Sequence, residues 1–253
     1  MNNLPASTGH LLGQTEEDIV GTTDLLGHDL NSPIATVIST LDMLIGLIDS
    51  DVEKATVQYF LKGALAAARR ERNMLFDLLD LARFEMDQYE LKLEPVDMGL
   101  LLRKCLDEEA FVVETKKVQL EVDIPSGAGL VAEVEIELFQ RVFSAILDNI
   151  MKFTVKGDRI RVEARREENR LMFRFSDTGR PFSTELLGKV ASRAPHWNQR
   201  QAGSRTSVGM GLPFVSAVLK AHQGSLEIKS QPAPPLTEFI LTIPGLNLTL
   251  PEG

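Results

Sequence analysis

Apolar residues recur at helical spacing through the first third of the chain. One such run, from about residue 18 to 48, predicts a long amphipathic helix, and a second follows the polar turn at 49–51. Pro33 lies inside the first helix and is expected to kink it, because proline lacks the N–H and its ring clashes with the Asp29 carbonyl. The apolar positions are Leu25, Ile34, Val37, Ile38, Leu41, Leu44, Ile45 and Ile48 in the first helix, and Val57, Leu61, Ala64, Ala68, Leu75, Leu79 and Ala82 in the second.

These two helices predict a helical hairpin that cannot bury its apolar stripes alone. A hairpin covers only one face of each helix, so the remaining apolar surface requires a partner. Two copies forming a four-helix bundle are the simplest solution. The sequence therefore predicts a homodimer.

The pattern changes near residue 92, where we place a domain boundary. Beyond it, stretches with the 3.6-residue period of helices alternate with stretches of period two, which are typical of strands. This order predicts an α+β domain with a mixed sheet covered by helices on one face. The expected domains are a flexible lead-in at 1–17, a helical domain at 18–92 and the α+β domain at 93–253. The α+β elements are helices at 98–116, 136–153 and 212–222, and strands at 118–124, 160–165, 171–176, 225–229 and 238–243.

Composition excludes several classes of protein. The chain has 27 basic and 36 acidic residues and a formal charge of −9, which argues against general binding to nucleic acid or an anionic membrane. Cys105 is the only cysteine, so no internal disulfide can form, and the four histidines lack zinc-ligand spacing. No apolar stretch reaches the roughly 18 residues of a membrane span, and no signal peptide is recognisable. We expect a cytoplasmic protein.

The first candidate site is the sequence HDLNSP at 28–33, on the first helix. A lone histidine near a helix start is most often a solvated surface residue. Here Asp29 could orient the His28 imidazole or accept its proton, leaving the other nitrogen free to attack a phosphoryl group. Ser32 lies one turn further along the same face, where its hydroxyl could orient a water molecule.

The second candidate is the pair Asn149 and Lys152, three residues apart on the predicted helix at 136–153. An amide oxygen can ligate a hard cation, and an ammonium beside it can approach phosphate. Most Asn/Lys pairs are merely solvated, so this pair alone is a weak indication.

Two glycine-containing stretches complete the candidate sites. Asp177 ends a strand and Gly179 follows, which suits a carboxylate that accepts a hydrogen bond from a ligand's amine; the alternative is an ordinary Asx turn. Gly209, Gly211 and Leu212 form a glycine-spaced loop running into a helix, whose free N–H groups favour an anion.

The order and spacing of these stretches resemble the sensor histidine kinase family over about residues 20–245. The sequence at 28–33 resembles the H-box of the dimerisation and phosphotransfer domain, and LLDLARFE at 78–85 resembles the end of its second helix. Asn149-x-x-Lys152 is similar to the N-box, Asp177-x-Gly179 to the D-box, and Gly209-x-Gly211-Leu212 to the G2 box of a GHKL-type ATP-binding domain. The tail at 222–226 with Thr237 fits the closing β-hairpin.

The resemblance implies a dimeric four-helix bundle followed by a Bergerat-type ATP-binding domain. It implies that His28 is autophosphorylated from ATP with Asp29 as base, that Asn149 holds Mg²⁺ and that Lys152 approaches phosphate. It further implies that Asp177 recognises the adenine amine and that Gly209 and Gly211 shape the phosphate loop. The phosphoryl group would then pass to an aspartate of a response-regulator receiver domain, and Ser32 could assist dephosphorylation of that regulator.

Three positions depart from the family pattern. Ala145 stands where a second N-box asparagine is usual, Pro181 replaces the second D-box glycine, and Ser207 replaces the first glycine of the G2 run. Trp197 is the one large ring in the expected lid and could be an anchor or a half-exposed loop residue. The alternative functions are therefore a histidine phosphotransfer protein or a regulator phosphatase with a degenerate ATP-binding domain.

Overall fold

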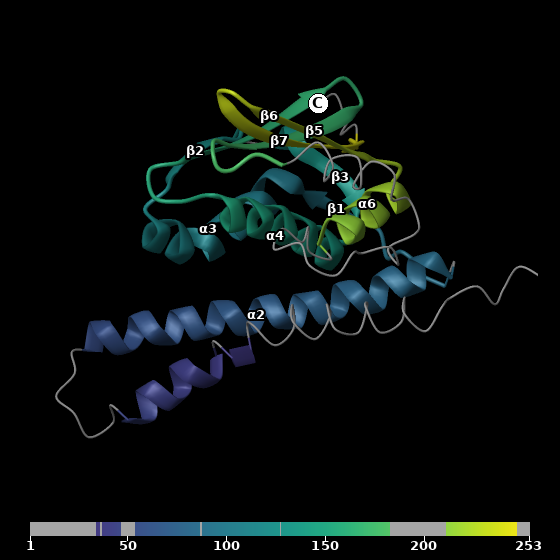
Figure 1. Ribbon diagram of the computed structural model, residues 1–253. Helices are drawn as coiled ribbons and strands as arrows, with labels where there is room; N and C mark the ends of the chain where they lie inside the picture. The colour runs from purple at the N-terminus through teal and green to yellow at the C-terminus, as the bar shows by residue number, and fades with distance from the viewer. Residues whose placement is uncertain are drawn as a thin grey trace, which may run out of the picture.

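The computed structural model describes residues 34–46, 54–182 and 211–246, apart from residues 36, 87 and 127. In these ranges the structure has three layers (Figure 1). A β-sheet packs on a layer of helices, and a long helix lies on the other side of that layer. The expected lead-in at 1–17, the kink at Pro33 and the polar turn at 49–51 lie outside the described residues.

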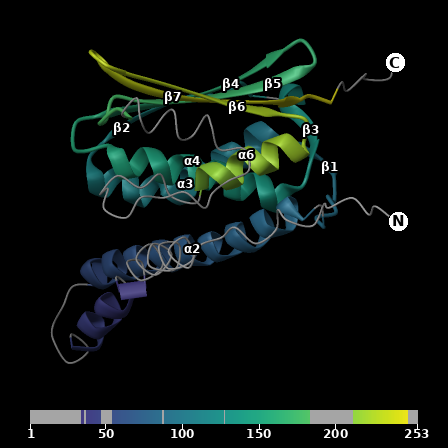
Figure 2. The same cartoon turned by 45° about the vertical axis from the view of Figure 1, so that its right-hand side comes forward.

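The long helix is α2, which spans Lys54–Glu85 and confirms the second helix expected from the apolar stripe. Residues 34–46 are also helical and run along the side of α2 that faces away from the sheet (Figures 1 and 2). In α2, the small residues Ala64 and Ala67 are buried, whereas Leu75 and Leu79 are about half exposed. Some of the apolar side chains in the predicted stripe of α2 are therefore exposed in the single chain. No helix among the described residues is long and apolar enough to cross a membrane.

The main sheet is mixed, as the sequence predicts, with five strands in the order β2-β4-β5-β7-β6. β2 is parallel to β4, and every other neighbouring pair is antiparallel. The inward apolar side chains of β4, β5 and β7 are buried, whereas the outward positions are mostly charged or polar, with exceptions that include Met172, Leu236 and Ile240. The strands are β2 (Gln119–Asp123), β4 (Arg159–Glu167), β5 (Arg170–Asp177), β6 (Ser225–Pro232) and β7 (Pro235–Pro244).

Three helices cover one face of this sheet, which is clearest in Figure 2: α3 (Met98–Lys116), α4 (Ile136–Phe153) and α6 (Gly211–Ala221). α4 lies at the centre of the core. Its apolar residues Phe143 and Ile146 are fully buried, and the Phe143 ring meets the Phe173 ring of β5 at 5.3 Å between centroids. The helices expected at 98–116, 136–153 and 212–222 are thus confirmed within one residue.

A second, two-stranded sheet was not expected from the sequence. β1 (Glu94–Asp97) pairs antiparallel with β3 (Val131–Val134), and a short 3-10 helix, η1 (Ala128–Leu130), precedes β3. The sequence pattern predicted no helix or strand at residues 94–97 or 128–134. Strands of four residues are too short to show a period, and their pairing depends on contacts distant in the chain.

Candidate functional site

The C-terminal half of α4, the end of β5 and the start of α6 meet at one place in the fold. α4 contributes Asn149, whose side chain is only 7% exposed. Its Nδ2 donates a hydrogen bond of 2.7 Å to the carbonyl oxygen of Ala145, one turn earlier. Because the nitrogen is used in this way, the amide oxygen is the atom with which Asn149 can contact a cation or a donor.

Asp177 is the last residue of β5 and is almost completely buried, at 2% exposure. Its Oδ1 accepts a 2.9 Å hydrogen bond from the Gly179 N–H, so the Asx-type turn is present and occupies one of the two oxygens. Burial raises the pKa of Asp177 to about 7; the Gly179 N–H opposes this shift, and the charge of Asp158 adds to it. The carboxyl is therefore poised to gain or lose a proton near neutral pH.

Gly179 holds the end of β5 against the last turn of α4. A Cβ atom at this position would lie 2.6 Å from the Phe153 carbonyl oxygen and 2.9 Å from Asp177 Oδ1. The same Phe153 carbonyl accepts a 3.0 Å hydrogen bond from the Arg180 N–H. Only glycine allows this close approach, which brings Asp177 next to the helix that carries Asn149.

The first residue of α6, Gly211, lies directly on α4. A Cβ atom there would be 3.2 Å from Ala145 Cβ and 3.4 Å from Asn149 Nδ2. The next residue, Leu212, is buried in the core. The N-terminal end of α6, which carries the partial positive charge of the helix dipole, is thus anchored beside Asn149.

Sequence reasoning assigned no role to two hydroxyl groups beside Asp177. Thr237 on β7 is the cross-strand partner of Asp177, and Ser230 on β6 is the partner of Thr237. Thr237 is 2% exposed, and the two hydroxyl oxygens are 3.1 Å apart. Alternate residues of β7 face the same side of the sheet, so Thr237 lies on the same face as the buried Phe239. This alternation is the sequence feature from which the position of Thr237 could have been predicted.

The remaining candidates are placed less centrally or lie outside the described residues. Lys152 is exposed at the end of α4, one turn beyond Asn149. His28, Asp29, Ser32 and Gly209 are not among the described residues. Within the described ranges, no group of three or more His, Cys, Asp or Glu side chains could hold a metal ion.

Comparison with known proteins shows that Asn149, Asp177 and Gly211 lie within a known domain family. Residues 134–247 match the family described as Histidine kinase-, DNA gyrase B-, and HSP90-like ATPase, and this match spans α4 to β7. The probable sensor kinase SilS of Salmonella typhimurium is 22% identical over 259 residues, which is 100% of this chain and 50% of SilS. The chain spans about half the length of the curated relatives it matches.

Two solved structures share the fold. Full-length ShkA in complex with AMPPNP aligns with a TM-score of 0.59 and 18% identity, covering 94% of this chain and 48% of ShkA. The histidine kinase ThkA in complex with the response regulator protein TrrA aligns with a TM-score of 0.57 and 15% identity, covering 91% of this chain and 63% of that one. At such low identity these structures establish the arrangement of the elements alone.

Proposed function

Because the chain belongs to the sensor histidine kinase family and carries a GHKL-type ATP-binding domain, we propose that it is a histidine kinase core. In this proposal His28 is phosphorylated from Mg-ATP and passes the phosphoryl group to an aspartate of a response regulator. The observation that carries the proposal is the junction of α4, β5 and α6, which brings Asn149, Asp177 and Gly211 together.

Asp177 is proposed to recognise the adenine base. Its second carboxylate oxygen, which takes no part in the bond to Gly179, would accept a hydrogen bond from the exocyclic amine. The neighbouring Thr237 hydroxyl is available at the same end of the sheet to support this contact. A guanine base carries a carbonyl in place of that amine and would face the carboxylate with an acceptor.

Asn149 and Lys152 are proposed to serve the phosphates. The orientation of the Asn149 amide suits a hard cation, since its oxygen is the atom not used by Ala145. Bound Mg²⁺ would neutralise charge on the β- and γ-phosphates, Lys152 would approach the phosphates, and Gly209 and Gly211 would shape the loop around them.

Phosphoryl transfer is proposed to occur at His28. A ring nitrogen attacks the γ-phosphorus, the bond from that phosphorus to the β–γ bridging oxygen breaks, and ADP leaves with the bond's electrons. Asp29 would accept or orient the ring proton, and Ser32 could orient water when the phosphorylated regulator is hydrolysed. These residues precede the described ranges, so their roles rest on the sequence.

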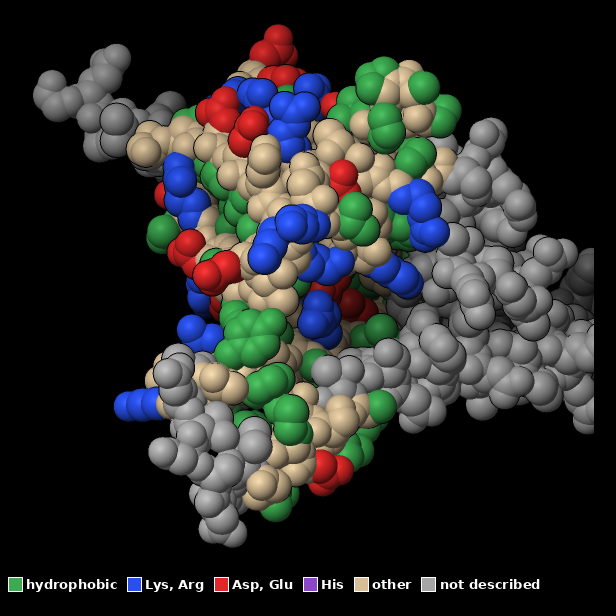
Figure 3. All heavy atoms as spheres, turned by 60° about the vertical axis from the view of Figure 1, so that its left-hand side comes forward, with side chains coloured by type: hydrophobic (Ala, Val, Ile, Leu, Met, Phe, Trp, Pro, Cys, Tyr) green, Lys and Arg blue, Asp and Glu red, His purple; other side chains and the backbone are tan. Residues whose placement is uncertain are grey.

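Two partners follow from the proposal. Half-exposed apolar side chains on α2 and on the helical segment at 34–46 support a homodimer; they include Ile38, Ile45, Leu75 and Leu79. In Figure 3, hydrophobic side chains are exposed in the lower part of the described surface and in a further group at the upper right, while most charged side chains lie in the upper and middle parts. The ThkA–TrrA complex supports a receiver domain as the second partner.

The decisive experiment is incubation with radiolabelled Mg-ATP. Wild type should acquire an acid-labile phosphate, His28→Ala should acquire none, and Ser32→Ala should be labelled like wild type because its proposed role is in dephosphorylation. Absence of label on folded wild type, with no measurable ATP affinity, would reject the kinase in favour of a phosphotransfer scaffold. The close packing of Ala145 against Gly211, where the family usually has an asparagine, is the feature that favours this second candidate.

A further inference from the structure

One backbone N–H and two hydroxyl side chains form a chain of hydrogen bonds that ends beside Asp177. The Phe182 N–H donates to Ser230 Oγ at 2.9 Å. Ser230 Oγ lies 3.1 Å from Thr237 Oγ1 on the neighbouring strand. Thr237 is the cross-strand partner of Asp177, and both residues are 2% exposed. This hydroxyl chain, made of the Phe182 N–H, Ser230 and Thr237, therefore crosses from the edge strand β6 to the proposed adenine contact.

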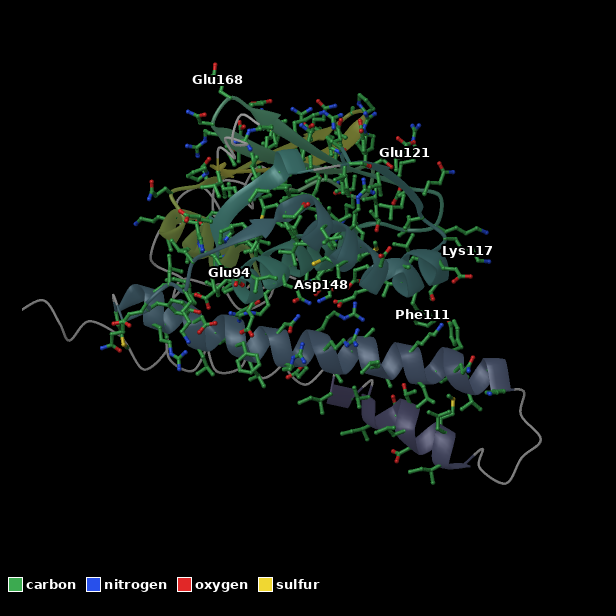
Figure 4. The ribbon with its side chains drawn as sticks, turned by 180° about the vertical axis from the view of Figure 1, so that it is seen from behind. Glu94, Phe111, Lys117, Glu121, Asp148 and Glu168 are labelled. Atoms are coloured by element: carbon green, nitrogen blue, oxygen red, sulfur yellow. The ribbon has the colours of Figure 1, made fainter. Side chains whose placement is uncertain are left out.

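The hydroxyl chain lies at one end of the main sheet. Figure 4 shows Glu121 of β2 and Glu168, in the turn between β4 and β5, at opposite ends of this sheet. Asp177 belongs to the end marked by Glu121, because β2 and the last residues of β5 both pair with the first residues of β4. The pairing of β5 with β7 and of β7 with β6 brings the two hydroxyl groups to the same end.

Packing fixes the N–H group at which the hydroxyl chain begins. The Phe182 side chain is buried. Its ring lies 5.0 Å from the Phe153 ring of α4 and 5.8 Å from the Phe239 ring of β7, measured between centroids, and both contacts are edge-to-face. Because these contacts hold Phe182 between a helix and the sheet, its N–H is kept in place toward Ser230.

The direction of these hydrogen bonds decides what Thr237 offers to a ligand. Each hydroxyl has one proton and two lone pairs. Because Ser230 already accepts a bond from an N–H, it becomes a stronger donor, since hydrogen bonds in a chain polarise one another. An ionised Asp177 opposite Thr237 also favours a Thr237 proton that points away from Ser230. Ser230 therefore donates to Thr237, and the Thr237 proton is left for the nucleotide site.

We propose that Ser230 is a positioning residue for adenine and acts through Thr237. Adenine presents a donor, the amine at C6, next to an acceptor, the ring nitrogen N1. Asp177 accepts from the amine, and Thr237, oriented by Ser230, donates to N1 directly or through one water molecule. Guanine has a carbonyl and an N–H at these positions, so both contacts would be lost. The role of Ser230 rests on the proposed binding of ATP and adds a determinant of base specificity on the edge strand.

The test compares the affinity of the full chain for ADP and for 1-deaza-ADP, which keeps the amine but lacks the N1 acceptor. Neither nucleotide has a γ-phosphoryl group to transfer, so calorimetry measures binding alone. Wild type should bind ADP about fivefold more tightly than 1-deaza-ADP, which is the usual contribution of one hydrogen bond. Ser230→Ala should bind ADP more weakly and lose most of this preference, whereas a purely structural role for Ser230 would weaken both nucleotides equally. Ser230→Thr, which keeps a hydroxyl and suits a strand, should restore the preference.

Ser225→Ala is the matched control on the same strand. It removes a hydroxyl at an exposed position opposite Thr242, toward the end of the sheet away from Asp177, and should keep the wild-type preference. Thr237→Val should lose the preference by itself. Adding Ser230→Ala to Thr237→Val should reduce the preference no further, because the two residues act in series.

The outcomes separate the role of Ser230 from the proposed function. If folded wild type binds neither nucleotide, the proposed ATP site is rejected, and the role of Ser230 with it. If wild type binds ADP but does not prefer it to 1-deaza-ADP, or if folded Ser230→Ala keeps the full preference, the role of Ser230 alone is overturned. Circular dichroism checks the folding of every variant. Should Ser230→Ala fail to fold, Ser230→Cys takes its place with the same expected loss, because a thiol is a weak donor.

Discussion

At the scale of single residues, the site depends on a carboxylate that the fold buries. Asp177 must be ionised to accept a hydrogen bond from an amine strongly, yet burial raises its pKa to about 7. ATP binding should therefore release a proton, and affinity should fall about tenfold between about pH 8 and about pH 6. Calorimetric titration with a non-hydrolysable ATP analogue across this range measures the effect.

Asp177→Asn provides the control, because the nucleotide phosphates titrate in the same pH range in both proteins. Loss of the charged acceptor costs about 1.5–3 kcal/mol, or roughly ten- to a hundredfold in affinity, and the part of the pH dependence due to Asp177 should disappear. Equal pH profiles for the two proteins would remove Asp177 from the binding site.

His222 provides a second prediction at this scale, concerning stability. Its Nδ1 donates to the Val218 carbonyl at 2.8 Å and its Nε2 accepts from the Glu135 N–H at 3.2 Å, so the folded protein holds it neutral. Burial lowers its pKa below 6.5. The unfolded chain then binds more protons, and the contribution of His222 to stability should decline as the pH falls below 6.5.

Urea unfolding of wild type and His222→Gln at about pH 7.5 and about pH 5 tests this contribution. The difference between the two proteins is the quantity to compare, because carboxyls with raised pKa values, such as Asp77, shift total stability in the opposite direction. A wild-type advantage that does not shrink at the lower pH would contradict the prediction.

At the scale of elements, two glycines illustrate opposite roles. Gly63 lies inside α2, where an added Cβ would sit 3.8 Å from Phe111 Cε1, an ordinary contact. Gly63→Ala should therefore raise the free energy of unfolding by about 0.5–1 kcal/mol, since alanine loses less backbone entropy in a helix. The matched Gly179→Ala should destabilise the protein, because its Cβ would collide with the Phe153 carbonyl. The urea concentration at the midpoint of unfolding measures the stability of both variants. A Gly63→Ala variant that is less stable than wild type would contradict the prediction.

At the scale of the whole molecule, the uncovered stripe of α2 is the proposed interface of the homodimer. Leu75 and Leu79 are 46% and 57% exposed, although the pattern marks them as interior positions. Leu75→Glu combined with Leu79→Glu should convert a dimer into monomers in sedimentation experiments. Leu100→Glu, at a 68% exposed position on α3, should remain dimeric. If the double variant stays dimeric, this face of α2 is not the interface.

How far the sequence determines the fold can be judged from particular elements. The helix expected at 136–153 and the strands expected at 160–165 and 171–176 follow from periodicity, and the structure confirms them. The pairing of β1 with β3 was missed, because residues 94–97 and 131–134 are too short to carry a period and are joined only by distant contacts.

The same division applies to the site. The sequence by itself identified Asn149, Asp177, Gly179 and Gly211 as residue types suited to a cation, an amine and a phosphate, because side-chain chemistry and spacing along one element are local properties. Only the tertiary structure decided that Thr237 lies opposite Asp177, that Ala145 packs on Gly211 and that Arg141 is shared by two acids of α2. Those contacts arise from packing between elements, and packing also sets the burial that moves the pKa of Asp177 and Asp77 to about 7.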